Sequence, residues 1–268
     1  MSAASGVQHL VLSGPSGVLN LHMPTGADLS FQDLSLRLVH ILDNALGSLS
    51  LKLDDSATQL QTDSSFATLS LNTTGSGASV LDASASGAAA VNVTGNQALD
   101  LTVDNQNVDA HALTAGLFAD AQSSNATVSL LGGSGNDNLN GGSGADRLNG
   151  GGTGVDQLTG NGGADTFVFN HAPTGTDVSL ITDFATGVDQ IELNHTAFSD
   201  LSWSGSPHTL AAGEFFQGEP TGISGQHIIF DPNSGNLYYD QDGAAGGAKL
   251  FANLGEGGDV HNTDIQVV

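Results

Sequence analysis

Apolar and polar residues alternate in short runs along the first half of the chain. Alternation with a period of two is typical of β-strands that bury one face and expose the other. Ser, Thr, Asn and Asp occupy most of the polar positions. The runs lie at residues 19–23, 34–38, 49–53, 69–71, 91–93, 99–103 and 128–130. The pattern therefore predicts an all-β region built from short, half-buried strands.

The spacing of these runs indicates how the strands are arranged. The runs that begin at Leu49, Leu69 and Val91 follow one another after 20 and 22 residues. A repeat of about twenty residues suits one rung of a solenoid, in which each rung packs on its neighbours. Aromatic residues make up only 5% of the chain, which suits a thin core better than a sandwich. We predict a right-handed parallel β-solenoid.

Residues 31–46 allow a second interpretation. Their apolar residues also fall at helical spacing, which would make a helix that caps or decorates the solenoid. These residues are Phe31, Leu34, Leu38, Ile41, Leu42 and Ala45. The sequence leaves both interpretations open.

A nine-residue pattern repeats four times within residues 132–168. Each copy combines glycines with an aspartate, and a large apolar residue follows two positions after the aspartate. The aspartates, which step by 9, 10 and 9 residues, are Asp137, Asp146, Asp156 and Asp165. A flexible glycine-rich linker has no reason to keep aspartate and apolar residue in phase. The repeats are therefore predicted to form an ordered structure.

The composition of each repeat suits calcium. Glycine lets the backbone turn through positive φ and aim its carbonyls inward. Calcium takes about six to eight oxygen ligands, commonly carboxylates and carbonyls together. One turn supplies about half of such a shell, so a neighbouring turn must supply the rest. The predicted glycine ligands are Gly133, Gly135, Gly142, Gly144, Gly152, Gly154 and Gly163.

The nonapeptides resemble those of the RTX family of secreted bacterial proteins. Residues 166–169, 181–193 and 229–243 are also similar to segments of that family, so the resemblance covers roughly residues 125–268. It implies calcium between a repeat and the second one along, which would pair Asp137 with Asp156 and Asp146 with Asp165. It also implies an uncleaved C-terminal signal for the type I secretion machinery.

The chain departs from the family pattern at two positions. Gly150 is inserted before the third repeat, and Asn161 replaces the second glycine of the fourth. Both changes put the geometry of the paired aspartate sites in question.

Four further aspartates are candidates for calcium binding. Asp183 and Asp189 flank a turn with a glycine, where RTX-like proteins often hold another calcium ion. Residues 231–242 are predicted to form a β-hairpin with its turn at residues 232–235. Asp240 and Asp242 at its end are either calcium ligands or ordinary surface turn residues.

The charge balance narrows the choice of partners. The chain has 4 basic and 28 acidic residues, a formal net charge of −24. Such a surface excludes nucleic acid and anionic membrane as electrostatic partners and favours divalent cations. The chain has no cysteine, which excludes disulfides and thiolate metal sites.

Signatures of catalysis are absent. There is no H-E-x-x-H and no G-x-S-x-G, and the nine histidines are scattered. We therefore predict no catalytic residue. Residues 1–9 lack the features of a cleavable signal peptide, and no apolar run reaches the roughly 20 residues of a membrane span. Export would use the C-terminus, and we expect the natural protein to be longer.

These observations predict three regions and one leading function. The regions are a solenoid over residues 1–125, a calcium-binding β-roll over 126–170, and a small C-terminal β lobe with the secretion signal over 171–268. We expect a non-enzymatic structural protein, secreted to the cell surface of a Gram-negative bacterium, that forms a surface layer or matrix. Its partners would be copies of itself or cell-surface polysaccharide. The alternatives are the secretion module of an exoenzyme and part of an RTX adhesin.

Overall fold

The computed structural model describes most of the chain. The described residues are 9–13, 17–21, 28–32, 37–41, 48–54, 56–62, 66–220, 225–243 and 247–268. Residues 1–8, Leu34, Leu42 and Ala45, on which some of the sequence predictions rest, lie outside them. The described helices are two short 3-10 turns, η1 (Ala212–Glu214) and η2 (Asn262–Asp264). Neither could cross a membrane, and no other described helix exists to do so.

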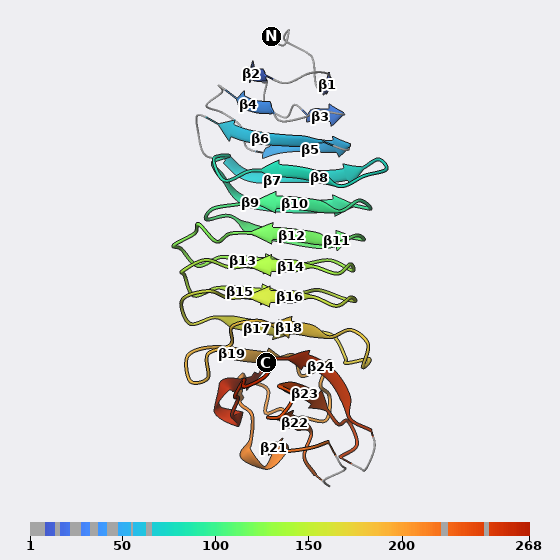
Figure 1. Cartoon of the computed structure of the whole chain (residues 1–268), viewed down its shortest axis with the longest axis vertical. Helices are drawn as coiled ribbons and strands as arrows, with labels where there is room; N and C mark the ends of the chain where they lie inside the picture. Colours follow the sequence, from blue (N-terminus) through green and yellow to red (C-terminus); the bar gives the residue numbers. More distant parts are fainter. Residues whose placement is uncertain are drawn as a thin grey trace.

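The chain winds into a stack in which each turn adds one strand to each of two parallel sheets (Figure 1). One sheet takes the odd-numbered strands β1 (His9–Ser13), β3 (Asp28–Gln32), β5 (Ser48–Asp54), β7 (Phe66–Thr74), β9 (Ala88–Gly95), β11 (Asn107–Leu113), β13 (Ser129–Leu131), β15 (Arg147–Asn149), β17 (Thr166–Phe169) and β19 (Gln190–Leu193). The other takes β2 (Gly17–Leu21), β4 (Arg37–Ile41), β6 (Ala57–Thr62), β8 (Ser79–Asp82), β10 (Leu99–Thr102), β12 (Leu117–Asp120), β14 (Asn138–Asn140), β16 (Gln157–Thr159) and β18 (Ser179–Ile181). The predicted parallel β-solenoid is confirmed.

One column of apolar side chains runs through the core. Leu49 pairs with Leu69, and Leu69 pairs with Val91, as their spacing in the sequence predicts. The column then continues through the repeats into the C-terminal lobe. Its members, each at most 2% exposed, are Leu49, Leu69, Val91, Val108, Leu130, Leu148, Phe167, Ile191 and Ile265. Burial of one face of every strand sets this register, because a one-residue slip would turn the apolar face outward.

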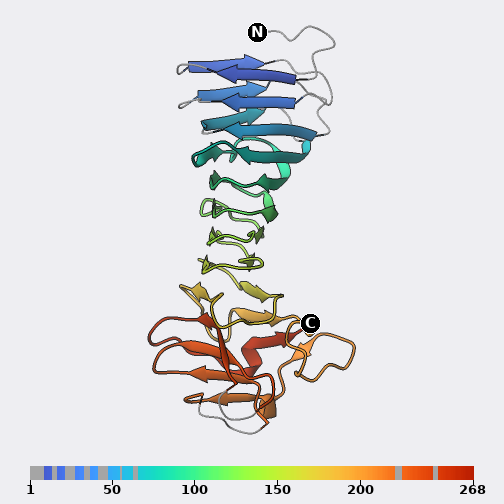
Figure 2. The same cartoon turned by 90° about the vertical axis from the view of Figure 1, so that its right-hand side faces the viewer.

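The stack narrows from its first rungs toward the nonapeptides (Figure 2). Strand β7 has nine residues, whereas β13 to β16 have three each. A nine-residue repeat has little chain left for a strand once its turn is made. Each short strand therefore buries a single apolar residue, such as Leu139 or Leu158 in one sheet and Leu148 in the other.

The helical interpretation of residues 31–46 is wrong wherever these residues are described. Phe31 lies in β3, and residues 37–41 form β4, which pairs in parallel with both β2 and β6. Two neighbouring strands satisfy the backbone of β4 along its length, and Val39 is buried in the core. Tertiary pairing therefore overrides the helical spacing, and the strand expected at residues 34–38 begins at Arg37.

The end of the solenoid is covered by a small β lobe (Figures 1 and 2). Its strands are β20 (His208–Thr209), β21 (Phe215–Gln217), β22 (Ile228–Asp231), β23 (Asn236–Tyr239), β24 (Lys249–Asn253) and β25 (Ile265–Val267). Strands β22 and β23 form the predicted antiparallel hairpin. Phe198 packs against Tyr239 and Phe251, with ring centroids 4.9 and 5.4 Å apart, so aromatic side chains build the core of the lobe.

Candidate metal centre in the repeat turns

The turns of the nonapeptides lie in two stacks, one along each side of the narrow roll. The amide of Gly152 donates to the carbonyl of Gly133 at 2.9 Å, which joins the third repeat to the first. The amide of Gly162 donates to the carbonyl of Gly142 at 3.0 Å, which joins the fourth repeat to the second. Each turn therefore contacts the second turn along the chain, as the family resemblance implies.

The repeat aspartates form a ladder within each stack. The amide of Asp137 donates to Oδ1 of Asp156 at 3.0 Å, and the amide of Asp146 donates to Oδ1 of Asp165 at 2.8 Å. The four side chains are between 1% and 6% exposed. The structure thus brings together the two expected pairs, with each carboxylate lying against the backbone of the preceding turn.

The second carboxylate oxygen distinguishes the first two repeats from the last two. Oδ2 of Asp137 accepts the amide of Gly133 at 2.8 Å, and Oδ2 of Asp146 accepts that of Gly142 at 2.6 Å. Within the fully described repeats, no amide of the same turn donates to Oδ2 of Asp156 or Asp165.

The two departures from the repeat pattern account for this difference. The insertion of Gly150 shifts the third turn, and the amide of Gly151 donates to Oδ1 of Asn149 at 2.9 Å. In the fourth turn the amide of Asn161 donates to Asp183 at 2.7 Å instead of to Asp165. Asn161 adopts φ of 68°, a left-handed conformation that asparagine tolerates and that Gly133 and Gly142 do not adopt.

The ladder carboxylates are buried without a neutralising partner. In the described part of the chain, none of them forms an ion pair with a basic side chain, and Arg147 pairs instead with Glu192. Burial raises the pKa of Asp137 and Asp165 to about 6 and that of Asp156 to about 7. Repulsion from Asp137 and Asp177 contributes to the raised pKa of Asp156. The turns concentrate negative charge that a cation would stabilise.

Two glycines make the close stacking of the turns possible. Gly154 and Gly163 adopt φ of 126° and 125°, a region that other residues rarely enter. A Cβ on either one would collide with the carbonyl oxygen of Gly135 or Gly144 in the turn below. The predicted glycine positions therefore lie where the turns meet, beside the carboxylates.

This donor set fits calcium. All of the groups are oxygens, either carboxylates or glycine carbonyls, which are the ligands that calcium prefers. Among the described residues, no group of three or more His, Asp or Glu side chains could hold a metal by itself. A metal here would therefore need the backbone carbonyls as well as Asp137, Asp146, Asp156 and Asp165.

The comparison with known families agrees with this geometry. The family model described as peptidase M10 serralysin C terminal matches residues 72–219, more than half of the chain. The chain belongs to this family. Serralysin-type C-terminal domains carry RTX repeats that bind calcium, and type I secretion exports them from Gram-negative bacteria. The resemblance to RTX proteins is confirmed at this level. No curated protein matches the chain.

The serralysin-type match includes Asp189, which extends the ladder by a fifth member. Its Oδ1 accepts the amide of Asp165 at 2.9 Å, and its Oδ2 accepts the amide of Ala185 at 2.8 Å. The order Gly-x-Asp-x-apolar recurs in residues 187–191, and this is the signal in the sequence. Asp189 thus makes the same two kinds of hydrogen bond as Asp137 and Asp146, one to the neighbouring turn and one to the amide four residues before it.

Asp183 lies outside the ladder. Its two oxygens accept the amides of Gly160 at 3.0 Å and Asn161 at 2.7 Å, so it anchors the start of the fourth repeat. The structure explains its position through the backbone, and calcium binding by Asp183 or Asp189 stays a prediction.

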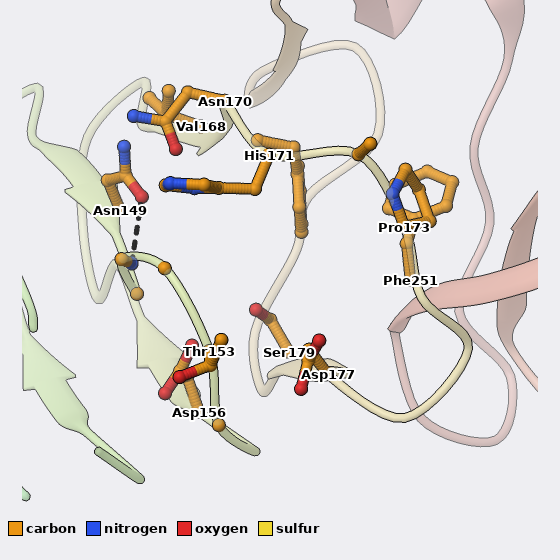
Figure 3. A pocket seen from close by; sticks show the side chains of 16 residues that line it. Asn149, Thr153, Asp156, Val168, Asn170, His171, Pro173, Asp177, Ser179 and Phe251 are labelled. Carbon is orange, nitrogen blue, oxygen red and sulfur yellow. Dashed lines mark hydrogen bonds between the residues drawn. The ribbon is translucent and has the colours of Figure 1, made fainter. Parts of the chain in front are cut away.

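A cleft beside the third repeat contains residues that the sequence analysis did not select. Residues 168–173 line it together with Asn149, Asp156, Asp177 and the repeat glycines. In Figure 3 the side chain of His171 extends toward Asn149, and Asp177 lies across the cleft from Asp156. The loop that carries His171 and Asp177 has no repeat pattern, so no local signal marked these residues.

Proposed function

We propose that the chain is a non-enzymatic, calcium-stabilised structural protein that type I secretion delivers to the cell surface, where it forms a surface layer or matrix. The continuity of the solenoid core carries this proposal. One apolar column joins the rungs before the repeats to the repeats themselves and to the lobe beyond them. Within the described residues, the repeats thus continue a rod whose rungs directly precede them.

The proposal assigns calcium to both stacks of turns. In one stack Asp137 and Asp156 would share ions with the carbonyls of the first and third turns, Gly133, Gly135, Gly152 and Gly154. In the other stack Asp146 and Asp165 would do so with Gly142, Gly144 and Gly163. Asp189 would extend the second stack, and Asp183 would hold the fourth turn or bind a further ion. The raised pKa of three of these carboxylates supports a cation at the stacks.

Calcium would also couple folding to export. Weak extracellular sites, with Kd of about 10⁻⁴–10⁻³ M, stay empty inside the cell and fill outside it. A chain with a net charge of −24 would remain unfolded in the channel and fold as calcium neutralises it. We place the roll at residues 126–170 and the region recognised by the secretion machinery at residues 171–268.

The secretion module of an exoenzyme is the second candidate. It is favoured by the family match, which is to the C-terminal part of a protease. This alternative predicts a globular catalytic domain ahead of the repeats, whereas the described residues ahead of the match, from His9 to Leu71, form solenoid rungs. Part of an RTX adhesin is a third candidate and predicts long tandem domains upstream.

A calcium titration of the purified chain tests the proposal. We expect ordered sheets or filaments on addition of millimolar calcium and dispersal in chelator, monitored by light scattering and negative-stain microscopy. Magnesium at the same ionic strength is the control for simple charge screening. A chain that binds calcium and remains monomeric at every concentration would favour the exoenzyme module.

A further inference from the structure

The turn after β23 contains a buried carboxylate with an unpaired oxygen. Asp240 is 1% exposed, which shows that it is not an ordinary surface turn residue. Its Oδ1 accepts the amide of Gly243 at 3.1 Å, while its buried Oδ2 has no hydrogen-bond partner in the structure. An ionised oxygen that loses water without gaining a partner is strongly unfavourable.

A second carboxylate, that of Asp242, lies near Oδ1 of Asp240. A Cβ on Gly247 would lie 3.2 Å from Oδ1 of Asp240 and 3.2 Å from Oδ1 of Asp242. The two carboxylates therefore converge beside a residue that has no side chain to fill the space. Burial, followed by the hydrogen bonding and repulsion between the two carboxyl groups, raises the pKa of Asp240.

The surrounding backbone holds Asp240 in this position. Its amide donates to the carbonyl of His227 at 2.8 Å, and its carbonyl contacts Nδ1 of His227 at 2.8 Å. These bonds tie the turn to the start of β22. The carboxylate is thus held against the other acidic group by the hairpin and not by a basic partner of its own.

The chemistry of the two groups selects the ion. Two carboxylates placed in this way repel each other, and a shared proton or a bound cation relieves that repulsion. Carboxylate oxygens suit calcium, which accepts irregular geometry, whereas magnesium requires a near-ideal octahedron. First-row transition metals from iron to zinc favour imidazole or thiolate ligands, whereas both of the proposed ligands here are carboxylates.

We propose that Asp240 and Asp242 bind a calcium ion in the turn between β23 and β24. This site lies outside the region of the family match, residues 72–219, and apart from the repeat turns. It would stabilise the lobe that covers the end of the solenoid. The proposal requires neither self-assembly nor calcium in the repeats, so its test is separate from that of the proposed function.

Terbium luminescence in the full-length chain provides a local readout. Tyr238 and Tyr239, the only two tyrosines of the chain, immediately precede the site, whereas the repeats contain neither tyrosine nor tryptophan. Excitation of tyrosine should therefore sensitise terbium bound at Asp240 and Asp242. We expect Asp242→Asn and Asp240→Asn each to abolish most of this emission and to lower the calcium stoichiometry from calorimetry by one.

Three comparisons make the result decisive. Asp259→Asn, a change of a half-exposed carboxylate in the same lobe, should leave both readouts unchanged. A repeat variant, Asp146→Asn with Asp165→Asn, should lose calcium but keep the tyrosine-sensitised emission. Because Asp242 is exposed, its variant should fold, which circular dichroism in calcium verifies. A folded Asp242→Asn protein with unchanged emission and stoichiometry would overturn the proposal and indicate a shared proton instead.

Discussion

Each ladder aspartate is positioned by backbone amides, which select a carboxylate but do not neutralise it. Asp146, for example, accepts the amides of Val128 and Gly142 through its two oxygens. These bonds fix the rotamer of the side chain in the folded turn. The remaining lone pairs of the oxygens and the neighbouring carbonyls can then serve an ion at little further conformational cost.

The raised pKa values predict an unusual pH dependence for the metal-free protein. Asp137, Asp156 and Asp165 have pKa values of about 6, 7 and 6 in the folded state, against 3.8 for the unconstrained group. Between these limits the folded chain binds more protons than the unfolded chain, so its free energy of unfolding falls as pH rises. In chelator, circular dichroism should therefore show more β structure at about pH 5 than at about pH 8.

Calcium should remove or reverse this trend, because protons and calcium compete for the same carboxylates. The variant Asp156→Asn should flatten the metal-free profile between about pH 6 and pH 8, since it removes the group that titrates there. Metal-free stability that rises steadily over the whole range would contradict the burial of ionisable carboxylates in the turns.

A double-mutant cycle tests whether the paired aspartates bind the same calcium ion. Asp146→Ala and Asp165→Ala should each lose the shared site, at a cost of about 2.7 kcal/mol when calcium is at a hundredfold excess over Kd. The double variant should lose clearly less stability than the sum of the two single losses, because the first substitution has already abolished the site. Thermal denaturation in calcium measures all three proteins.

The matched control substitutes one aspartate in each of the two stacks. Asp146→Ala combined with Asp156→Ala removes one carboxylate from each stack, so the two losses should add. Equal additivity in both pairs would reject the shared site between Asp146 and Asp165.

At the scale of the turn, adjacent glycines should differ in their tolerance of a side chain. Gly163→Ala places a Cβ against the carbonyl of Gly144 and forces φ of 125° on alanine, so we expect a loss of about 2 kcal/mol or more. Gly162→Ala meets only Ser143, at 3.7 Å, and should change stability by less than about 0.5 kcal/mol. Calcium-saturated denaturation curves of the two variants provide the comparison, and equal losses would show that stacking at Gly163 is not tight.

At the scale of the whole molecule, calcium should govern folding. The chain carries a net charge of −24, and ordering its glycine-rich turns costs about 1–2 kcal/mol per residue. Ions that bind only the folded form offset this cost by about 2.7 kcal/mol per site at a hundredfold excess over Kd. Circular dichroism at about pH 8 should show a β spectrum in millimolar calcium that is largely lost in chelator. A β spectrum unchanged by chelator would reject calcium-dependent folding.

The sequence by itself determined the pattern that repeats along the rod. Leu49, Leu69 and Val91 lie in one core column because a period of two decides which face is buried, and a spacing of about one rung brings equivalent residues into register. In the nonapeptides, glycine, aspartate and apolar residue recur in phase, so their roles in turn, ladder and core could be predicted. The hairpin of β22 and β23 followed from its turn residues in the same local way.

Only the tertiary structure decided what depends on contacts between distant segments. Residues 37–41 are a strand because β2 and β6 pair with them, although their spacing also permits a helix. Asp189 joins the ladder 24 residues after Asp165 because β17 and β19 pair across an irregular loop. Asp240 is buried because the lobe folds over its turn. Local periodicity does not predict such contacts, because the free energy that selects them comes from packing between segments far apart in the chain.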